Sequence, residues 1–185
     1  MAGKALIMID MLNEFVKGRL SSPFAQNIVP QIKKVLESAR KNDALVVFAR
    51  DCHRKGDKEF EIWGEHALCD SPDSQIIEEL APDTKREKEF VVPKRRYDAF
   101  WMTDLDLLLR EFEIKEVVLT GISTDICVLH TAMGAFFRNY RVSIVEDGVA
   151  AFTEEDHRWA LNYMKKAYGA SLISSEEAST DDFWK

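Results

Sequence analysis

Residues 117–127 read Val-Val-Leu-Thr-Gly-Ile-Ser-Thr-Asp-Ile-Cys, an apolar run, a glycine and a second partly apolar segment. The run up to Thr120 predicts a buried strand, Gly121 interrupts it, and the residues that follow predict a helix. Cys127 then lies past the carboxyl end of a strand and in the first turn of a helix. Backbone N–H groups are unpaired at such a position and the helix dipole is positive, so we expect a thiolate to be favoured.

The same alternation of strand and helix runs along the whole chain. We expect strands near 4–9, 44–49, 90–94, 116–120, 141–146 and 170–173, and helices near 27–41, 74–80, 103–113, 125–138, from 153 onward and in a short acidic tail. Apolar strands that alternate with helices predict an α/β fold, a three-layer α/β/α arrangement around a mostly parallel six-stranded sheet. The length of 185 residues predicts one domain, residues 1–185.

Composition excludes several classes of function. The net charge of −7 argues against binding to nucleic acid or to an anionic membrane surface. The apolar runs are too short to span a bilayer, and a strand starts too close to Met1 to leave room for a signal peptide. The three cysteines show no disulfide-framework spacing, so we expect a reducing, cytoplasmic setting in which Cys52 and Cys69 have no role.

Several chemically capable side chains follow the predicted strands directly. They are Asp10, Asp51, His53, Lys94 and Cys127. The carboxyl ends of parallel strands meet at one edge of a sheet, and ligands bind outside that edge. Each residue also has an ordinary alternative: a cysteine on an apolar helix is usually core, and a lysine at a strand end is usually solvated. The long polar loop of residues 51–73 adds to the expectation of a site at this edge.

Taken together, these residues and their neighbours resemble the isochorismatase-like cysteine hydrolases, a superfamily that includes nicotinamidases and N-carbamoylsarcosine amidase. The resemblance covers almost the whole chain and is carried by residues 6–15, 51–53, 63–66, 93–100 and 121–127. It implies the isochorismatase-like (Rossmann-like) fold and a catalytic triad of Asp10, Lys94 and Cys127. It also implies a cis peptide between Ile122 and Ser123, with the backbone N–H groups of Ser123 and Cys127 forming an oxyanion hole.

The implied reaction is hydrolysis of a small amide. Asp10 takes the thiol proton of Cys127, Lys94 lowers the pKa of that thiol, and the thiolate attacks the amide carbonyl. Nicotinamide is the leading substrate, a carbamoylated amino acid the alternative, and a non-catalytic scaffold of the same fold a third hypothesis. The resemblance further implies a homodimer or homotetramer, and an apolar helix face at Phe136 and Phe137 could supply the contact.

A divalent metal is expected beside the triad. Asp51, His53 and His66 would hold it, leaving positions open for water or substrate. Zn²⁺ is the first choice, with Fe²⁺ or Mn²⁺ as alternatives. Glu59 is either a fourth ligand or solvated, and we favour the solvated reading.

The substrate pocket is expected to be aromatic. Phe15 and Trp63 match the positions that sandwich the flat ring in nicotinamidases, although core packing is the general default for such residues. Tyr97 would line the same pocket. Arg95, or its neighbour Arg96, could instead bind a substrate carboxylate bidentately, which would suit a carbamoylated amino acid. His130 is either a second base or a packing residue, and we favour packing.

Overall fold

A computed structural model describes residues 3–185. Its strands are β1 (Gly3–Ile9), β2 (Leu45–Asp51), β3 (Glu89–Lys94), β4 (Ile114–Ile122), β5 (Arg141–Ala150) and β6 (Ser171–Ile173). Its helices are α1 (Asn13–Val16), α2 (Val29–Lys41), α3 (Phe60–Trp63), α4 (Leu105–Glu111), α5 (Leu129–Phe137), α6 (Glu154–Tyr168) and α7 (Ser175–Ala178). Short helical turns lie at η1 (Pro72–Ser74), η2 (Glu78–Leu80) and η3 (Thr124–Val128).

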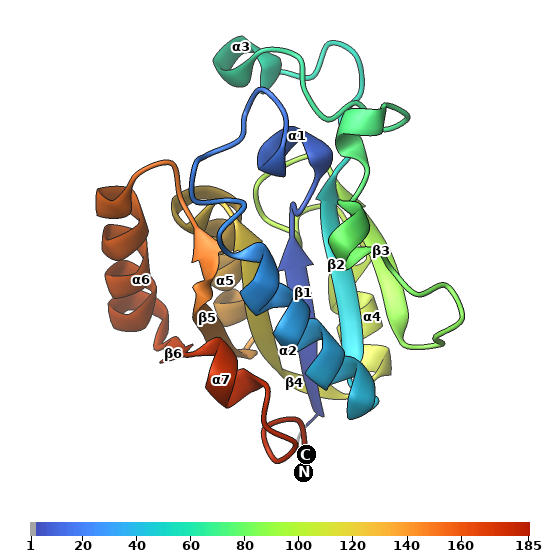
Figure 1. The fold of residues 1–185 in the computed structure, drawn as a ribbon, viewed down its shortest axis with the longest axis vertical. Coiled ribbons are helices and arrows are strands. Elements are labelled where there is room, and N and C mark those ends of the chain that lie inside the picture. The colour runs from blue at the N-terminus through green and yellow to red at the C-terminus, as the bar shows by residue number, and fades with distance from the viewer. Residues whose placement is uncertain (1–2) are drawn as a thin grey trace.

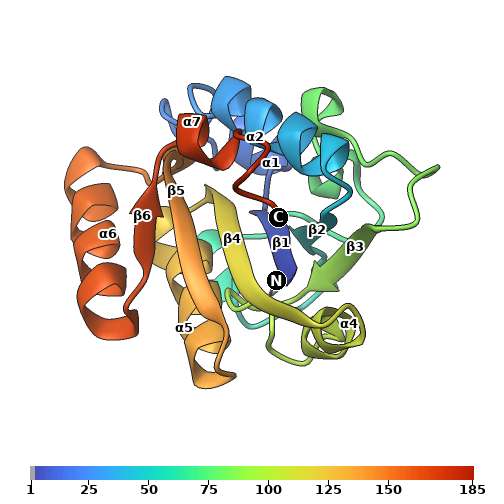
Figure 2. The ribbon, with the colours of Figure 1, turned by 90° about the horizontal axis from the view of Figure 1, so that it is seen from below.

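All six strands are parallel and form one sheet in the order β3-β2-β1-β4-β5-β6. The sheet has helices on both faces, with α2 and α7 on one and α4, α5 and α6 on the other (Figure 2). The expected three-layer fold is therefore confirmed, and the sheet is parallel throughout. Within the described residues, no helix combines the length and apolarity needed to cross a membrane.

The alternation of side chains along β1 explains its unbroken apolar sequence. Ala5, Ile7 and Ile9 pack into the core beneath α4, α5 and α6, while Leu6 and Met8 pack into the core beneath α2. Successive side chains of a strand point to opposite faces, so a strand covered on both faces must be apolar at every position. The carboxyl ends of β1 and β2 point toward α1 and α3 (Figure 1).

Three local predictions were inaccurate. The expected helix at 74–80 is replaced by the two separate turns η1 and η2. The helix expected to start at 125 begins instead as a π-helical turn, η3, which continues into α5. Strand β5 extends to Ala150, four residues beyond its predicted end at 146, and this brings residues 151 and 152 to the edge of the pocket described below.

Candidate active site

The sheet brings Asp10, Lys94 and Cys127 together at its carboxyl edge. The Lys94 ammonium lies 2.7 Å from Asp10 Oδ2 and 3.5 Å from Cys127 Sγ. Asp10 directly follows β1, Lys94 ends β3, and Cys127 lies in η3 after β4. All three side chains are buried. The Ile122–Ser123 peptide is cis, as expected, and Ser123 lines the same pocket as Cys127.

Two carboxylates share the Lys94 ammonium. Asp51, the last residue of β2, lies 2.5 Å from Lys94 Nζ, and its backbone N–H donates to Asp10 Oδ1 at 2.8 Å. The registers that pair Asp51 with Lys94 and Ile9 with Gly121 fix this geometry from the backbone. The site therefore holds two acids and one cation whose side chains are almost fully buried.

These surroundings separate the pKa values of the two acids. Burial, together with the charge of Asp51, raises the pKa of Asp10 to about 6. Burial also acts to raise the pKa of Asp51, but the neighbouring Lys94 and His53 outweigh it and hold that pKa at about 2. Asp51 is thus a fixed anion near neutral pH, whereas Asp10 can gain or lose a proton close to that range.

The pKa of the Cys127 thiol differs from the value that the sequence led us to expect. Burial raises its pKa well above the ordinary value, and Asp10 and Asp51 act in the same direction, while Lys94 only partly opposes them. The structure therefore does not favour the thiolate that the sequence predicted, first because the thiol is buried and then because two carboxylates share the charge of Lys94. The pKa of Lys94 lies well above its usual value despite burial, since both acids stabilise the ammonium.

Beside this cluster lies a group of four buried side chains that can hold a metal ion. Asp51, His53, Glu59 and His66 each offer a ligand atom, and these atoms all lie within 4.8 Å of one another. His53 Nδ1 contacts Asp57 Oδ2 at 3.0 Å and His66 Nδ1 contacts the Gly64 carbonyl at 2.8 Å, which leaves both Nε2 atoms facing the cluster.

The residues fit a divalent cation. His53 Nε2 is buried and has no hydrogen-bond partner, which is costly unless a ligand completes it. Two imidazoles and two carboxylates are also a donor set that Zn²⁺ accepts. Glu59 contradicts the solvated reading, since it is buried and its Oε1 lies 3.8 Å from His53 Nε2. Burial and the nearby Asp51 raise the pKa of Glu59 to about 7.

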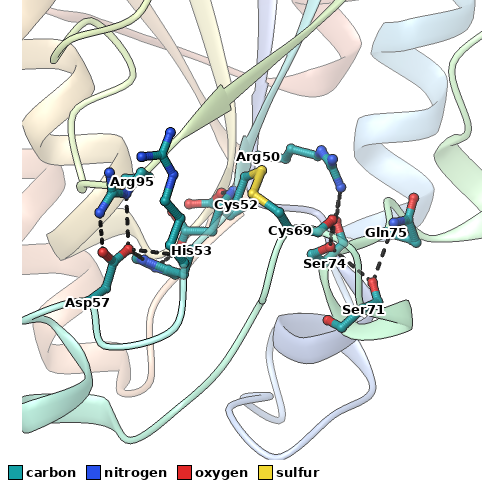
Figure 3. Close-up of a disulfide and its surroundings, with 12 residues drawn as sticks. Arg50, Cys52, His53, Asp57, Cys69, Ser71, Ser74, Gln75 and Arg95 are labelled. Atoms are coloured by element: carbon teal, nitrogen blue, oxygen red, sulfur yellow. Dashed lines mark hydrogen bonds and ion pairs between the residues drawn. A yellow bond between two sulfur atoms is a disulfide. The ribbon is translucent and has the colours of Figure 1, made fainter.

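Arg95 does not point into the site. Its guanidinium pairs with Asp57, the carboxylate that also contacts His53 (Figure 3). Arg95 and Arg96 are absent from the pocket lining, where the described residues include no lysine or arginine. The prediction that Arg95 binds substrate is therefore corrected: it orients the outer partner of a candidate metal ligand. Asp57 was missed because a lone acid in a polar loop carries no signal in the sequence.

A largely apolar pocket opens above Cys127, with a volume of about 510 Å³ counting its open mouth. Phe15, Trp63 and Tyr97 line it, which brings together the three predicted aromatic residues. The Trp63 indole N–H donates to the Tyr97 hydroxyl at 3.0 Å, and the Trp63 ring stacks on Phe152, with centroids 6.2 Å apart. Phe152 was not predicted, although an aromatic residue close behind a strand end is the signal that would have found it.

Three further side chains have roles that differ from those expected or were left open. Cys52 and Cys69 are joined by a disulfide across the base of the loop that carries α3 (Figure 3), so the prediction that they have no role is wrong. Their separation of 17 residues is bridged by the fold, which brings their Cα atoms to 4.1 Å. His130 Nδ1 contacts the Ile126 carbonyl at 2.7 Å and is absent from the pocket lining, as a packing residue would be.

Comparison with known proteins gives consistent matches over nearly the whole chain. Residues 4–177 match the model of the isochorismatase domain. N-carbamoylsarcosine amidase from Thermoplasma acidophilum is 40% identical, with 96% of this chain and 98% of that chain covered and a TM-score of 0.88. The nicotinamidase PncA from Bacillus subtilis is 34% identical, with 93% and 99% covered and a TM-score of 0.89. Nicotinamidase 3 from Arabidopsis thaliana is 32% identical over 91% of this chain and 83% of its own length.

Proposed function

Because the chain belongs to the isochorismatase family of hydrolases, we propose that it is a cysteine-dependent amidase that converts nicotinamide to nicotinate and ammonia. The observation that carries this proposal is the position of Cys127. Its thiol lies 3.5 Å from the Lys94 ammonium, in a pocket that Asp10 and the aromatic side chains also line. A scaffold protein would have no need to bury this combination of groups.

In the proposed reaction, Asp10 accepts the proton of the Cys127 thiol as sulfur attacks the amide carbon. Coupling proton loss to attack suits a thiol whose own pKa is high, because the anion never has to accumulate. The backbone N–H groups of Ser123 and Cys127 stabilise the oxygen anion of the tetrahedral intermediate. Lys94 keeps its charge throughout and holds Asp10 in place.

The intermediate collapses when the carbon–nitrogen bond breaks. Asp10 returns its proton to the leaving nitrogen, so that ammonia departs and a thioester remains on Cys127. Asp10, again ionised, then takes a proton from water as the water oxygen attacks the thioester. Collapse of the second intermediate releases the carboxylic acid and restores the thiol.

Asp51, His53, Glu59 and His66 are the proposed ligands of a divalent metal, with Zn²⁺ preferred over Fe²⁺ or Mn²⁺. When bound, the ion would supply a Lewis-acid contact for the pyridine nitrogen or for a water molecule at the end of the pocket. The outer contacts of His53 to Asp57 and of His66 to Gly64 would hold the two imidazoles in a ligating tautomer.

The lining of the pocket supports nicotinamide over a carbamoylated amino acid as the substrate. The lining is largely apolar and aromatic, which suits a flat neutral ring. A substrate carboxylate would need a buried cation, and Arg95 is already paired with Asp57. The 40% identity to the Thermoplasma acidophilum enzyme nevertheless keeps N-carbamoylsarcosine as a second candidate substrate.

We also propose a homodimer or homotetramer in the cytoplasm. The exposed side chains of Phe136 and Phe137 on α5 support self-association, since large apolar side chains are costly to leave in water. If the protein is cytoplasmic, we expect the Cys52–Cys69 bond to respond to redox conditions, because disulfides found in the cytosol are usually redox-responsive.

The test is ammonia release from nicotinamide and, in parallel, from N-carbamoylsarcosine, by the parent and by Cys127→Ala. We expect the parent to release ammonia from nicotinamide and the variant to release none. Turnover of N-carbamoylsarcosine but not of nicotinamide would change the proposed substrate and leave the proposed mechanism unchanged. Equal turnover by parent and variant would remove Cys127 as the nucleophile.

A further inference from the structure

The Cys52–Cys69 disulfide closes the loop that carries most of the metal cluster. Cys52 lies between Asp51 and His53, directly after β2, and Cys69 lies three residues after His66. Three of the four candidate ligands, namely His53, Glu59 and His66, lie inside the closed loop. The disulfide therefore joins the start of the loop, at the end of β2, to its returning end (Figure 3).

The candidate ligands are not equally well attached. His53 is paired on both sides of its backbone: its N–H donates to the Ala67 carbonyl and its carbonyl accepts from the Cys69 N–H, both at 3.0 Å. The His66 ring contacts Gly64 of its own loop, and outside the loop it packs on the ring of Phe15, with centroids 5.8 Å apart. The place of His66 relative to the sheet thus depends on how the loop is closed at its base.

The returning end of the loop is anchored mainly through Cys69. Its carbonyl accepts from the Ser74 hydroxyl at 2.9 Å, and Arg50 of β2 donates to the Ser74 carbonyl at 2.8 Å (Figure 3). Apart from the sulfur–sulfur bond, the loop is held only by non-covalent contacts. These are hydrogen bonds, the Arg95–Asp57 ion pair and the packing of His66 on Phe15, each a modest net contribution to stability. Breaking that bond would leave a ligand-bearing loop held at its base by hydrogen bonds.

We propose that the Cys52–Cys69 pair is a thiol–disulfide exchange site that controls how tightly the neighbouring cluster holds its metal ion. The inference rests on the metal site of the proposed function, and not on the identity of the substrate. Both cysteines are half-buried, so a small dithiol or the exposed dithiol of a reductase can reach them. Cys127 is buried and unpaired, and takes no part in the exchange.

The exchange is a two-electron step. A thiolate of the dithiol attacks one sulfur of the pair, the sulfur–sulfur bond breaks, and a mixed disulfide forms. The second thiol of the reductant then displaces the remaining sulfur. Cys52 and Cys69 end as thiols, each with one proton, and the reductant ends as a disulfide.

Reduction restores chain freedom to the 53–68 segment, and this lowers the fraction of time for which all four donors face one point. An ion that needs donors from both the sheet and the loop is then held more weakly. The contacts among Asp10, Lys94 and Cys127 come from strand ends and η3, outside the loop, so they persist. The reduced protein would keep its nucleophile while losing its ion.

The experiment measures the affinity of the full chain for Zn²⁺ alone, by competition with a chromophoric chelator. We expect reduction with a phosphine to weaken Zn²⁺ binding by about 10–100-fold, the range seen when the support of a metal ligand is removed. The double variant Cys52→Ser/Cys69→Ser should bind as weakly as the reduced parent and should not respond to reductant. Cys127→Ser, the matched control, should respond as the parent does.

Three results would overturn the inference. One is three titratable thiols in the denatured protein after oxidation with glutathione disulfide, where one is expected. Another is a Zn²⁺ affinity that changes by less than about twofold on reduction while circular dichroism shows a folded chain. The last is loss of the circular dichroism signal on reduction, since the bond would then support the fold as a whole. Failure of nicotinamide as a substrate, with the Zn²⁺ response intact, would remove the proposed reaction alone.

Discussion

Asp10 and Lys94 project from the ends of strands, whereas Glu59 and His66 come from the loop that Cys52 and Cys69 close. The first pair is positioned by the register of a parallel sheet, which cannot shift without moving every side chain to the opposite face. The second pair is positioned by one disulfide, by backbone hydrogen bonds at the base of the loop and by side-chain contacts. The acid and the lysine beside the nucleophile are therefore placed by the backbone of the sheet, whereas Glu59 and His66 depend on the contacts of a loop.

The largest effect on the rate of the reaction is expected from a substitution at the strand ends. Asp10→Asn should lower kcat for the amidase reaction by about 10²–10⁴-fold, because the thiol loses the base that accepts its proton. Steady-state ammonia release measures this. Asp73→Asn, at an exposed position in η1, is the matched control and should leave kcat unchanged. A loss of less than about tenfold in Asp10→Asn would mean that another group takes the proton.

The free energy of unfolding should also depend more on the ion pairs at the strand ends than on the ion pair to the loop. Lys94→Met leaves two buried carboxylates without their cation, so the free energy of unfolding should fall by about 3–5 kcal/mol. Arg95→Met breaks an ion pair whose arginine side chain is 42% exposed, and the loss should be clearly smaller. Urea titration compares the two variants, and equal losses would contradict the distinction between the buried ion pairs at the strand ends and the ion pair to the loop.

A substitution in the loop should change the affinity for the metal ion more clearly than any other property. Asp57→Asn removes the charged partner of His53 Nδ1, so Zn²⁺ affinity should fall by about 10–100-fold. Chelator competition measures this in the absence of substrate. Asp73→Asn again serves as the control for loss of one acidic charge. Unchanged affinity would show that the orientation of His53 is fixed without Asp57.

The pH profile separates the two regions without any mutation. The pKa of Asp10 is raised to about 6, and the reaction needs the ionised acid, so kcat/KM should rise with pH through that value. Below it, activity should fall by about tenfold per pH unit, while an ordinary aspartate would stay ionised to about pH 4. Glu59→Gln in the loop should leave the midpoint near 6. A shift of the midpoint in Glu59→Gln would mean that a group of the metal cluster titrates in this range, and not Asp10.

The smallest effect is expected at the pocket mouth. Phe152→Ala removes the ring that stacks on Trp63, so KM for nicotinamide should rise by about two- to tenfold with little change in kcat. Trp159→Ala, which removes an exposed ring that stacks on Tyr163 of α6, is the control for loss of an aromatic stack. A fall in kcat of the same size would mean that Phe152 also positions the reacting carbonyl.

Prediction from the sequence succeeded where local pattern and strand topology coincide. The apolar runs identified the strands, and the residues that follow them included Asp10, Asp51, Lys94 and Cys127, which the structure brings together. Prediction failed for the 51–73 loop: Glu59 was expected to be solvated, and Arg95 was assigned to substrate because nothing in the sequence marks Asp57 of the loop as its partner. Side chains in such a loop contact residues that are distant in the chain, and the periodicity of the sequence does not indicate those contacts.

By itself the sequence determined the parallel sheet, the edge at which the site forms and the chemical groups that reach it, because burial on both faces dictates apolar strands and parallel strands end together. Only the tertiary structure decided the burial of Glu59, the Cys52–Cys69 bond and the raised pKa of the Cys127 thiol. Each of these depends on distances of a few ångströms between segments far apart in the chain. Charge and solvation act through those distances, and residue type alone does not specify them.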